Sequence, residues 1–218
     1  MQVNRPEKEP GGLSWDEDRS ADVSDRFCET RVVDDRVRPD DELAALGEKL
    51  AGESSGPSDC ARTVCRLVWD EMTYQSGSTQ GHGHASDAWE ARMGVCQDMA
   101  HVAIGVLRAS GVPARYVSGY LHPKREPVVG DTVVGESHAW IEWWDGKWVG
   151  FDPTNNILPG DRHVVVARGR DYTDVPPLTG IFSGGARPRR WPSRSRSPGC
   201  PDSAAPHCLR HRMLVSDP

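Results

Sequence analysis

The sequence has no long apolar run. No stretch of its 218 residues approaches the roughly 20 consecutive apolar residues that a membrane-spanning helix requires. The first residues, Met1 to Lys8, also lack the apolar segment of a secretory signal peptide. We therefore expect no membrane partner and, as the default, a cytoplasmic location.

An excess of positive charge is also missing. The chain has 26 lysines and arginines against 32 aspartates and glutamates, which gives a net charge of −6. Binding to nucleic acid depends on clustered positive charge, so no nucleic-acid partner is expected. Arginines do gather after residue 186, and a basic tail for RNA or a membrane surface is an alternative that the overall charge disfavours.

The cysteines do not form a recognisable disulfide framework or zinc motif. Six cysteines in a chain of this length favour a reducing compartment. Cys60 and Cys65 lie five apart on a predicted helix, whereas zinc-binding pairs usually have shorter spacing within a loop. His82-Gly83-His84 offers two ligands but no third at a convincing spacing. We predict no metal and no cofactor.

The length and the changes in composition predict one domain with two appendages. Residues 1–26 are charged and lack periodicity, so they are predicted to be disordered or the remnant of a missing region. Residues 27–185 are predicted to form the domain. Residues 186–218 are predicted to be a disordered basic tail, and we expect this tail to be out of frame in a GC-rich coding sequence.

A cysteine lies at the predicted start of a buried helix. Gly94 and Val95 precede Cys96, and apolar residues continue to Gly111, a suitable residue to end the helix. A helix N-terminus stabilises the thiolate, which is the nucleophilic form of cysteine. The backbone N–H of Cys96 is also a candidate oxyanion donor, with the side chain of Gln97 as a second.

A β-hairpin is predicted around Asp145-Gly146. A two-residue turn would direct His138 and Asp152 to opposite faces. A three-residue loop from Trp144 to Gly146, with Gly146 in the left-handed conformation, would place His138 directly opposite Asp152. The apolar pattern favours this second register, because it gathers the apolar residues on one face: Ala139, Ile141, Trp143, Val149 and Phe151.

The three polar residues suit nucleophilic catalysis. Cys96 would attack, His138 would transfer protons, and Asp152 would orient and stabilise the imidazolium. Trp140, on the same face as His138, is either a wall of the substrate cleft or a packing residue.

Four motifs in this order resemble the transglutaminase-like superfamily. They are Gly94-Val-Cys-Gln-Asp98, Gly111-Val-Pro-Ala-Arg-Tyr-Val-Ser-Gly-Tyr120, Ser137-His-Ala-Trp140 and Phe151-Asp-Pro-Thr-Asn155. The resemblance implies an α+β, papain-like core of the bacterial type, with a central nucleophile helix packed on an antiparallel sheet. It also implies a Cys-His-Asp triad. Larger relatives usually have an N-terminal β-region, and we expect the present chain to be truncated there.

The resemblance implies an acyl-transfer enzyme that acts on a protein or peptide through a cysteine thioester. Water as the acceptor would make it a peptidase or amidase, and an amine would make it a protein-glutamine transamidase. We expect hydrolysis for a bacterial-type domain. The alternative is a papain-like interaction module without catalytic activity.

Overall fold

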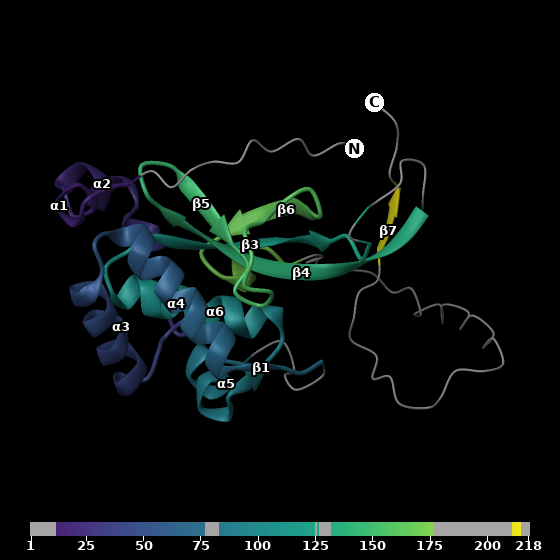
Figure 1. The fold of residues 1–218 in the computed structure, drawn as a ribbon, viewed down its shortest axis with the longest axis horizontal. Coiled ribbons are helices and arrows are strands. Elements are labelled where there is room, and N and C mark those ends of the chain that lie inside the picture. The colour runs from purple at the N-terminus through teal and green to yellow at the C-terminus, as the bar shows by residue number, and fades with distance from the viewer. Residues whose placement is uncertain (1–11, 77–82, 125, 127–131, 177–210, 215–218) are drawn as a thin grey trace, which may run out of the picture.

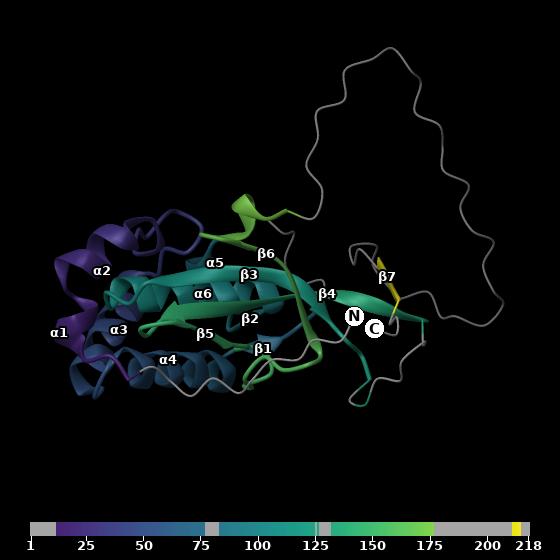
Figure 2. The same cartoon turned by 90° about the horizontal axis from the view of Figure 1, so that it is seen from above.

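The structure is a computed structural model that describes residues 12–76, 83–124, 126, 132–176 and 211–214. A layer of helices covers one face of an antiparallel sheet (Figure 1), and in the view from above the strands β3 (Ala114–Leu121) and β5 (Trp148–Phe151) overlap α6 (Cys96–Ala109) behind them (Figure 2). The predicted α+β class is therefore confirmed. In the described ranges, none of the helices combines the length and apolar character needed to cross a bilayer.

The helical layer is organised around α6, Cys96–Ala109. Every residue from Asp98 to Arg108 is buried, as expected for a helix that is apolar on most sides. Its neighbours are α3 (Asp41–Glu53), α4 (Pro57–Glu71) and α5 (Ala85–Ala91). A central nucleophile helix on a sheet was the predicted arrangement.

The main sheet has the strand order β5-β4-β3-β6. The strands are β3 (Ala114–Leu121), β4 (Thr132–Trp144), β5 (Trp148–Phe151) and β6 (His163–Gly169), and each adjacent pair is antiparallel. A 3-10 helix, η2 (Tyr172–Asp174), follows β6. The short strands β1 (Thr73–Tyr74) and β2 (Met93–Gly94) form a separate parallel pair. Because β5 and β6 lie at opposite edges of these four strands, their connection must cross β4 and β3.

The loop between β4 and β5 begins one residue later than predicted, which shifts the strand pairing by two residues, so that Trp143 pairs with Val149 instead of Lys147. Trp144 pairs with Trp148, so the loop is Asp145 to Lys147, and Gly146 has the expected left-handed conformation with φ of 73°. His138 and Asp152 share a face, as predicted, but they are not directly opposite. The loop shifts because the buried carboxylate of Asp145 accepts hydrogen bonds from distant groups, including the side chain of Ser58.

The segment before α3 also differs from the prediction of disorder, from residue 12 onward. It forms α1 (Trp15–Asp18), α2 (Ala21–Arg26) and the 3-10 helix η1 (Cys28–Thr30). Asp145 accepts hydrogen bonds from the backbone N–H groups of Gly12 (3.0 Å) and Leu13 (2.8 Å). Phe27 packs on Trp144 with ring centroids 4.3 Å apart. These contacts hold the segment against the hairpin, whereas residues 1–11 lie outside the described part.

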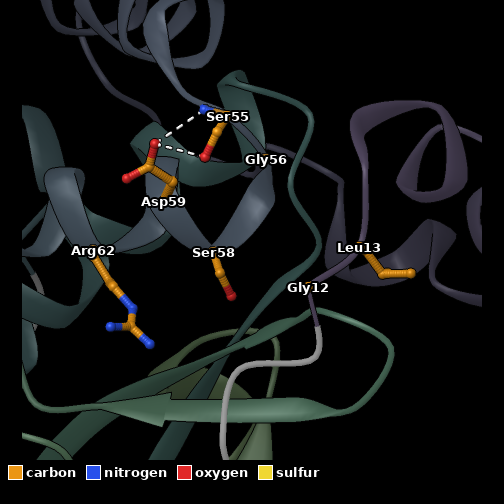
Figure 3. A pocket seen from close by; sticks show the side chains of 7 residues that line it. All are labelled: Gly12, Leu13, Ser55, Gly56, Ser58, Asp59 and Arg62. Atoms are coloured by element: carbon orange, nitrogen blue, oxygen red, sulfur yellow. Dashed lines mark hydrogen bonds between the residues drawn. The ribbon is translucent and has the colours of Figure 1, made fainter.

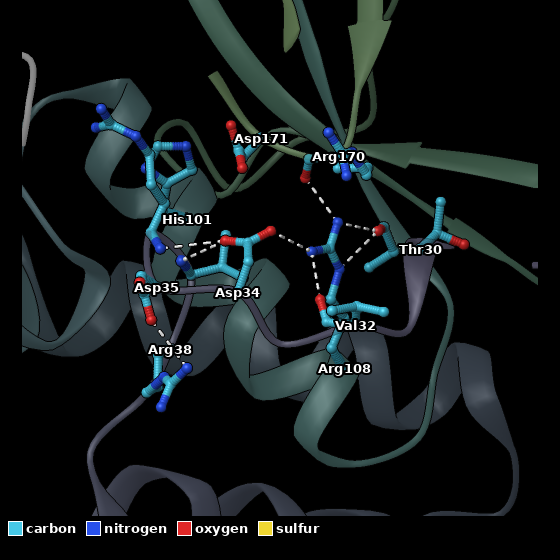
Figure 4. A network of polar contacts seen from close by, with 12 residues as sticks. Thr30, Val32, Asp34, Asp35, Arg38, His101, Arg108, Arg170 and Asp171 are labelled. Atoms are coloured by element: carbon cyan, nitrogen blue, oxygen red, sulfur yellow. Dashed lines mark hydrogen bonds and ion pairs between the residues drawn. The ribbon is translucent and has the colours of Figure 1, made fainter. Parts of the chain in front are cut away.

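A buried arginine joins the C-terminal end of α6 to three other segments (Figure 4). The guanidinium of Arg108 donates to the carbonyl oxygens of Ala114 (3.0 Å), Val32 (2.8 Å) and Arg170 (2.6 Å). It also forms an ion pair with Asp34 at 3.5 Å. The network fixes the far end of the helix that begins at Cys96.

In the predicted basic tail, the structure describes only β7 (His211–Leu214), which pairs with the first residues of β4. The remainder of that predicted segment lies outside the described residues.

Candidate active site

Cys96 is the first residue of α6. The helix start is fixed by the carboxylate of Asp98, which accepts a hydrogen bond from the backbone N–H of Val95 at 2.8 Å. The first backbone N–H groups of a helix have no partner within the helix, so they are available to an oxyanion. Cys96 is half-buried and free of any disulfide.

His138 lies on β4 between Cys96 and Asp152. Its Nε2 is 2.7 Å from Oδ2 of Asp152, and its side chain is also hydrogen-bonded to Cys96. Burial lowers the pKa of His138, but the hydrogen bonds to Asp152 and Cys96 outweigh burial and raise this pKa to about 10. The imidazole is therefore protonated at neutral pH.

Asp152 follows β5, is fully buried and accepts several hydrogen bonds. Oδ1 accepts from the backbone N–H groups of Thr154 (3.0 Å) and Asn155 (3.2 Å). Oδ2 accepts from the side-chain amide of Asn155 (2.7 Å) as well as from His138. Burial raises the pKa of this carboxyl, but the hydrogen bonds, that from His138 first, outweigh burial and hold the pKa well below its usual range. Asp152 is ionised and held in one orientation.

A second histidine, His163, also contacts Asp152. Its Nε2 is 3.1 Å from Oδ2 of Asp152, and the residue is 1% exposed. Neither His163 nor the side chain of Asn155 was predicted as a site residue. Asn155 could have been found from the turn that follows β5, because asparagine and aspartate favour such turns. His163 has no comparable local signal, since it reaches Asp152 only through the pairing of β6 with β3.

The other two predicted residues lie beside the triad. Gln97, the second residue of α6, is half-buried, and its role as an oxyanion donor stays a prediction. Trp140 is fully buried, with its ring centroid 6.0 Å from that of His138. Its ring is tilted by 31° from that of His138, and its contact with substrate stays a prediction.

Three ligand atoms of the site are close enough to hold a metal ion. They belong to His138, Asp152 and His163 and lie within 4.8 Å of one another. Both of the contacts to Asp152 have ordinary hydrogen-bond lengths, so a metal is not needed to explain them. Of the sequence candidates, Cys60 and Cys65 are both buried in the helical core, and His82 lies outside the described residues.

The larger of two described pockets lies away from the triad. It has a volume of about 340 Å³ and lies between the start of α4 and residues 12–13, with Ser55, Ser58, Asp59 and Arg62 among its lining (Figure 3). A smaller pocket of about 210 Å³ is lined in part by Met93 and Asp98. This smaller pocket adjoins the segment that leads into Cys96.

The structure resembles a solved putative cysteine protease from Cytophaga hutchinsonii, with a TM-score of 0.59, 29% identity and coverage of 73% of this chain and 50% of the other. The fold is thus papain-like. Residues 44–153, which include Cys96, His138 and Asp152, match the family model of the transglutaminase-like superfamily. This chain belongs to that superfamily, which supports a cysteine-dependent acyl-transfer activity.

Two relatives by sequence differ in how much is known of them. An uncharacterised protein of Mycobacterium leprae is 44% identical over 172 residues, which are 79% of this chain and 61% of the relative. A protein-glutamine gamma-glutamyltransferase of Pseudomonas aeruginosa is 33% identical over 122 residues, which are 53% of this chain and 18% of that enzyme. The chain thus spans less than two thirds of each relative.

Proposed function

We propose that this chain is a thiol-dependent enzyme that cleaves an amide bond of a protein or peptide through a thioester on Cys96. The observation that carries the proposal is the chain of contacts from Cys96 through His138 to Asp152. A protonated histidine between a thiol sulfur and a buried carboxylate is the arrangement that activates a cysteine nucleophile.

The proposed reaction has two halves. The thiolate of Cys96 attacks the amide carbonyl, and the backbone N–H at the start of α6 binds the oxyanion. His138 then gives its Nδ1 proton to the leaving amine as the C–N bond breaks, which leaves a thioester. Water attacks the thioester, His138 takes a proton from it, and the carboxylic acid is released with Cys96 restored.

Hydrolysis is favoured over transamidation for two reasons. The solved neighbour is itself described as a putative cysteine protease, and its alignment covers 73% of this chain. The half-buried position of Cys96 leaves the thioester open to water, and transfer to an amine requires that water be excluded. The cytoplasmic location stays a prediction.

The first experiment is alkylation by iodoacetamide between pH 5 and 9, with peptide mapping of each cysteine. At pH 6 an ordinary thiol is almost fully protonated and therefore reacts slowly with iodoacetamide. Because the proposed site pairs the Cys96 thiolate with the imidazolium of His138, Cys96 should react at least tenfold faster than the exposed Cys28. Burial raises the pKa of Cys60 to about 11, and burial also raises the pKa of Cys65. These two thiols should therefore stay unlabelled.

Turnover is then tested on unfolded protein and peptide amides, with and without an added primary amine. Free carboxylate products that require Cys96 would support hydrolysis, and amine incorporation would indicate transamidation. The Cys96→Ser variant should lose both labelling and turnover while keeping the fold. If Cys96 reacts no faster than Cys28, the triad is not assembled and the chain is better described as a non-catalytic interaction module.

A further inference from the structure

The carboxylate of Asp152 is shared by two imidazoles. Oδ2 is 2.7 Å from Nε2 of His138 and 3.1 Å from Nε2 of His163. We propose that His163 is a positioning residue of the active site, a neutral imidazole that donates its Nε2 proton to Asp152 and limits how tightly that carboxylate holds His138. This inference rests on the proposed function, since it assigns a role within the same site.

The hydrogen bonds of His163 determine which nitrogen carries the proton. The backbone N–H of Gly160 points at Nδ1 with an N···N distance of 3.3 Å. A backbone N–H can only donate, so Nδ1 is the acceptor and has no proton. The proton of the neutral ring is therefore on Nε2, which faces Asp152. Because His163 is almost fully buried, water does not compete for this contact.

The fold brings His163 to Asp152 from the opposite edge of the four strands. His163 begins β6 and pairs with Leu121, so it shares a face with Gly119 and His138. The connection from Asp152 to Arg162 crosses β4 and β3, and the hydrogen bond between Asp152 and His163 joins its two ends.

Gly119 leaves the space that lets Trp140 and His163 lie next to each other. A Cβ at Gly119 would lie 2.6 Å from the ring of Trp140 and would overlap the carbonyl oxygen of Val164. The absent side chain leaves room for the indole of Trp140, whose ring centroid lies 6.0 Å from that of His138 and 5.3 Å from that of His163, the latter edge-on. Both imidazoles thus have the same buried indole as a neighbour.

The consequence for catalysis follows from competition among the donors. Oδ1 is occupied by two backbone N–H groups, so the interactions that vary are those at Oδ2. A hydrogen bond from His163 draws negative charge away from the bond to His138. Without it, Asp152 would hold the imidazolium of His138 more strongly, and His138 would release its proton to the leaving amine less readily.

The test compares two substitutions of His163 with a neighbouring control. His163→Leu removes the donor, whereas His163→Gln keeps an N–H donor in a similar position. Val164→Ala trims β6 on the other face of the sheet and serves as the control for a general loosening of the strand. Titration of ¹⁵N-labelled imidazoles by NMR from pH 6 to 11 follows both histidines directly.

We expect wild-type His163 to give the spectrum of a neutral ring protonated on Nε2. In His163→Leu the pKa of His138 should rise by about one unit, the effect of losing one hydrogen bond to a charged group. In His163→Gln and Val164→Ala it should stay within about 0.3 units of wild type. The amide-cleavage rate at saturating substrate should fall only in the leucine variant.

Two results would overturn the inference: a wild-type His163 protonated on Nδ1, or leucine and glutamine variants with the same His138 titration. If His163→Leu does not fold, the wild-type tautomer and the comparison of His163→Gln with wild type still decide the question. A failure of the proposed function is distinct, because Cys96 would then be unreactive in wild type whatever the His163 spectrum showed.

Discussion

Replacing Asp152 with asparagine should disable the site through the tautomer of His138 rather than through the loss of charge alone. Oδ1 of Asp152 faces two backbone N–H donors that cannot reverse. Oδ2 faces two side chains that can, the ring of His138 and the amide of Asn155. The amide NH₂ of an asparagine is therefore expected at the Oδ2 position, because these two partners can become acceptors there, whereas Nε2 of His163 stays a donor.

Once that NH₂ faces Nε2 of His138, Nε2 must accept and the ring proton moves to Nδ1, next to Cys96. The histidine can then no longer take the thiol proton. The same substitution in a serine-protease triad lowers turnover by a factor on the order of 10⁴, equivalent to about 5.5 kcal/mol of transition-state stabilisation. We expect a loss of this order in amide cleavage, and a loss of rapid alkylation of Cys96 at pH 6.

The assay measures both rates for Asp152→Asn and for Asp161→Asn, a matched control because Asp161 is exposed on the same connection. Near-UV circular dichroism confirms that each variant is folded. An Asp152→Asn protein that is folded and retains rates within tenfold of wild type would refute the assignment of Asp152 to the triad.

Three further substitutions separate activity from stability. Gly119→Ala should slow alkylation of Cys96 by displacing Trp140; an unchanged rate in a folded protein would mean that the indole beside the two histidines does not position them. Arg108→Met should lower the free energy of unfolding by about 3 kcal/mol, because it orphans buried carbonyl oxygens, yet leave alkylation of the folded protein unchanged. Burial lowers the pKa of His101 from 6.5 to about 4, so between these two values the unfolded chain binds a proton that the folded protein does not. The free energy of unfolding should therefore fall by about 3 kcal/mol from pH 7 to pH 4. Urea unfolding of His101→Leu at both pH values should show a smaller fall than wild type, and an equal fall would contradict the reasoning.

Local sequence signals predicted much of the fold. The apolar run after Cys96 predicted a buried helix, and alternation in 139–151 predicted which residues of the hairpin face the core. The apolar pattern required the three-residue loop rather than the two-residue turn, and the pairing that this loop gives also placed His138 and Asp152 on one face. Each of these inferences depends on neighbours within one element or one hairpin, where periodicity is informative.

Features that depend on distant partners could not be predicted in this way. The hairpin loop is one residue later than expected because Asp145 binds residues 12, 13 and 58. His163 joins the site through strand pairing that no local pattern encodes. The helix at Trp15 did have a signal, the capping box of Ser14 and Glu17, which the high charge of the surrounding residues obscured.

The connection that crosses the sheet from Asp152 to Arg162 also separates Asp152 from His163 along the chain, so the two are not synthesised together. A ribosome makes the chain from the N-terminus, so Cys96 emerges first, His138 next and Asp152 after that. The last donor to Asp152, His163, emerges only as β6 begins. A nascent chain that stops short of β6 therefore has Cys96 and Asp152 but not the full set of hydrogen-bond partners of that carboxylate. Under the proposed function, completion of the sheet, rather than appearance of the cysteine, completes the site.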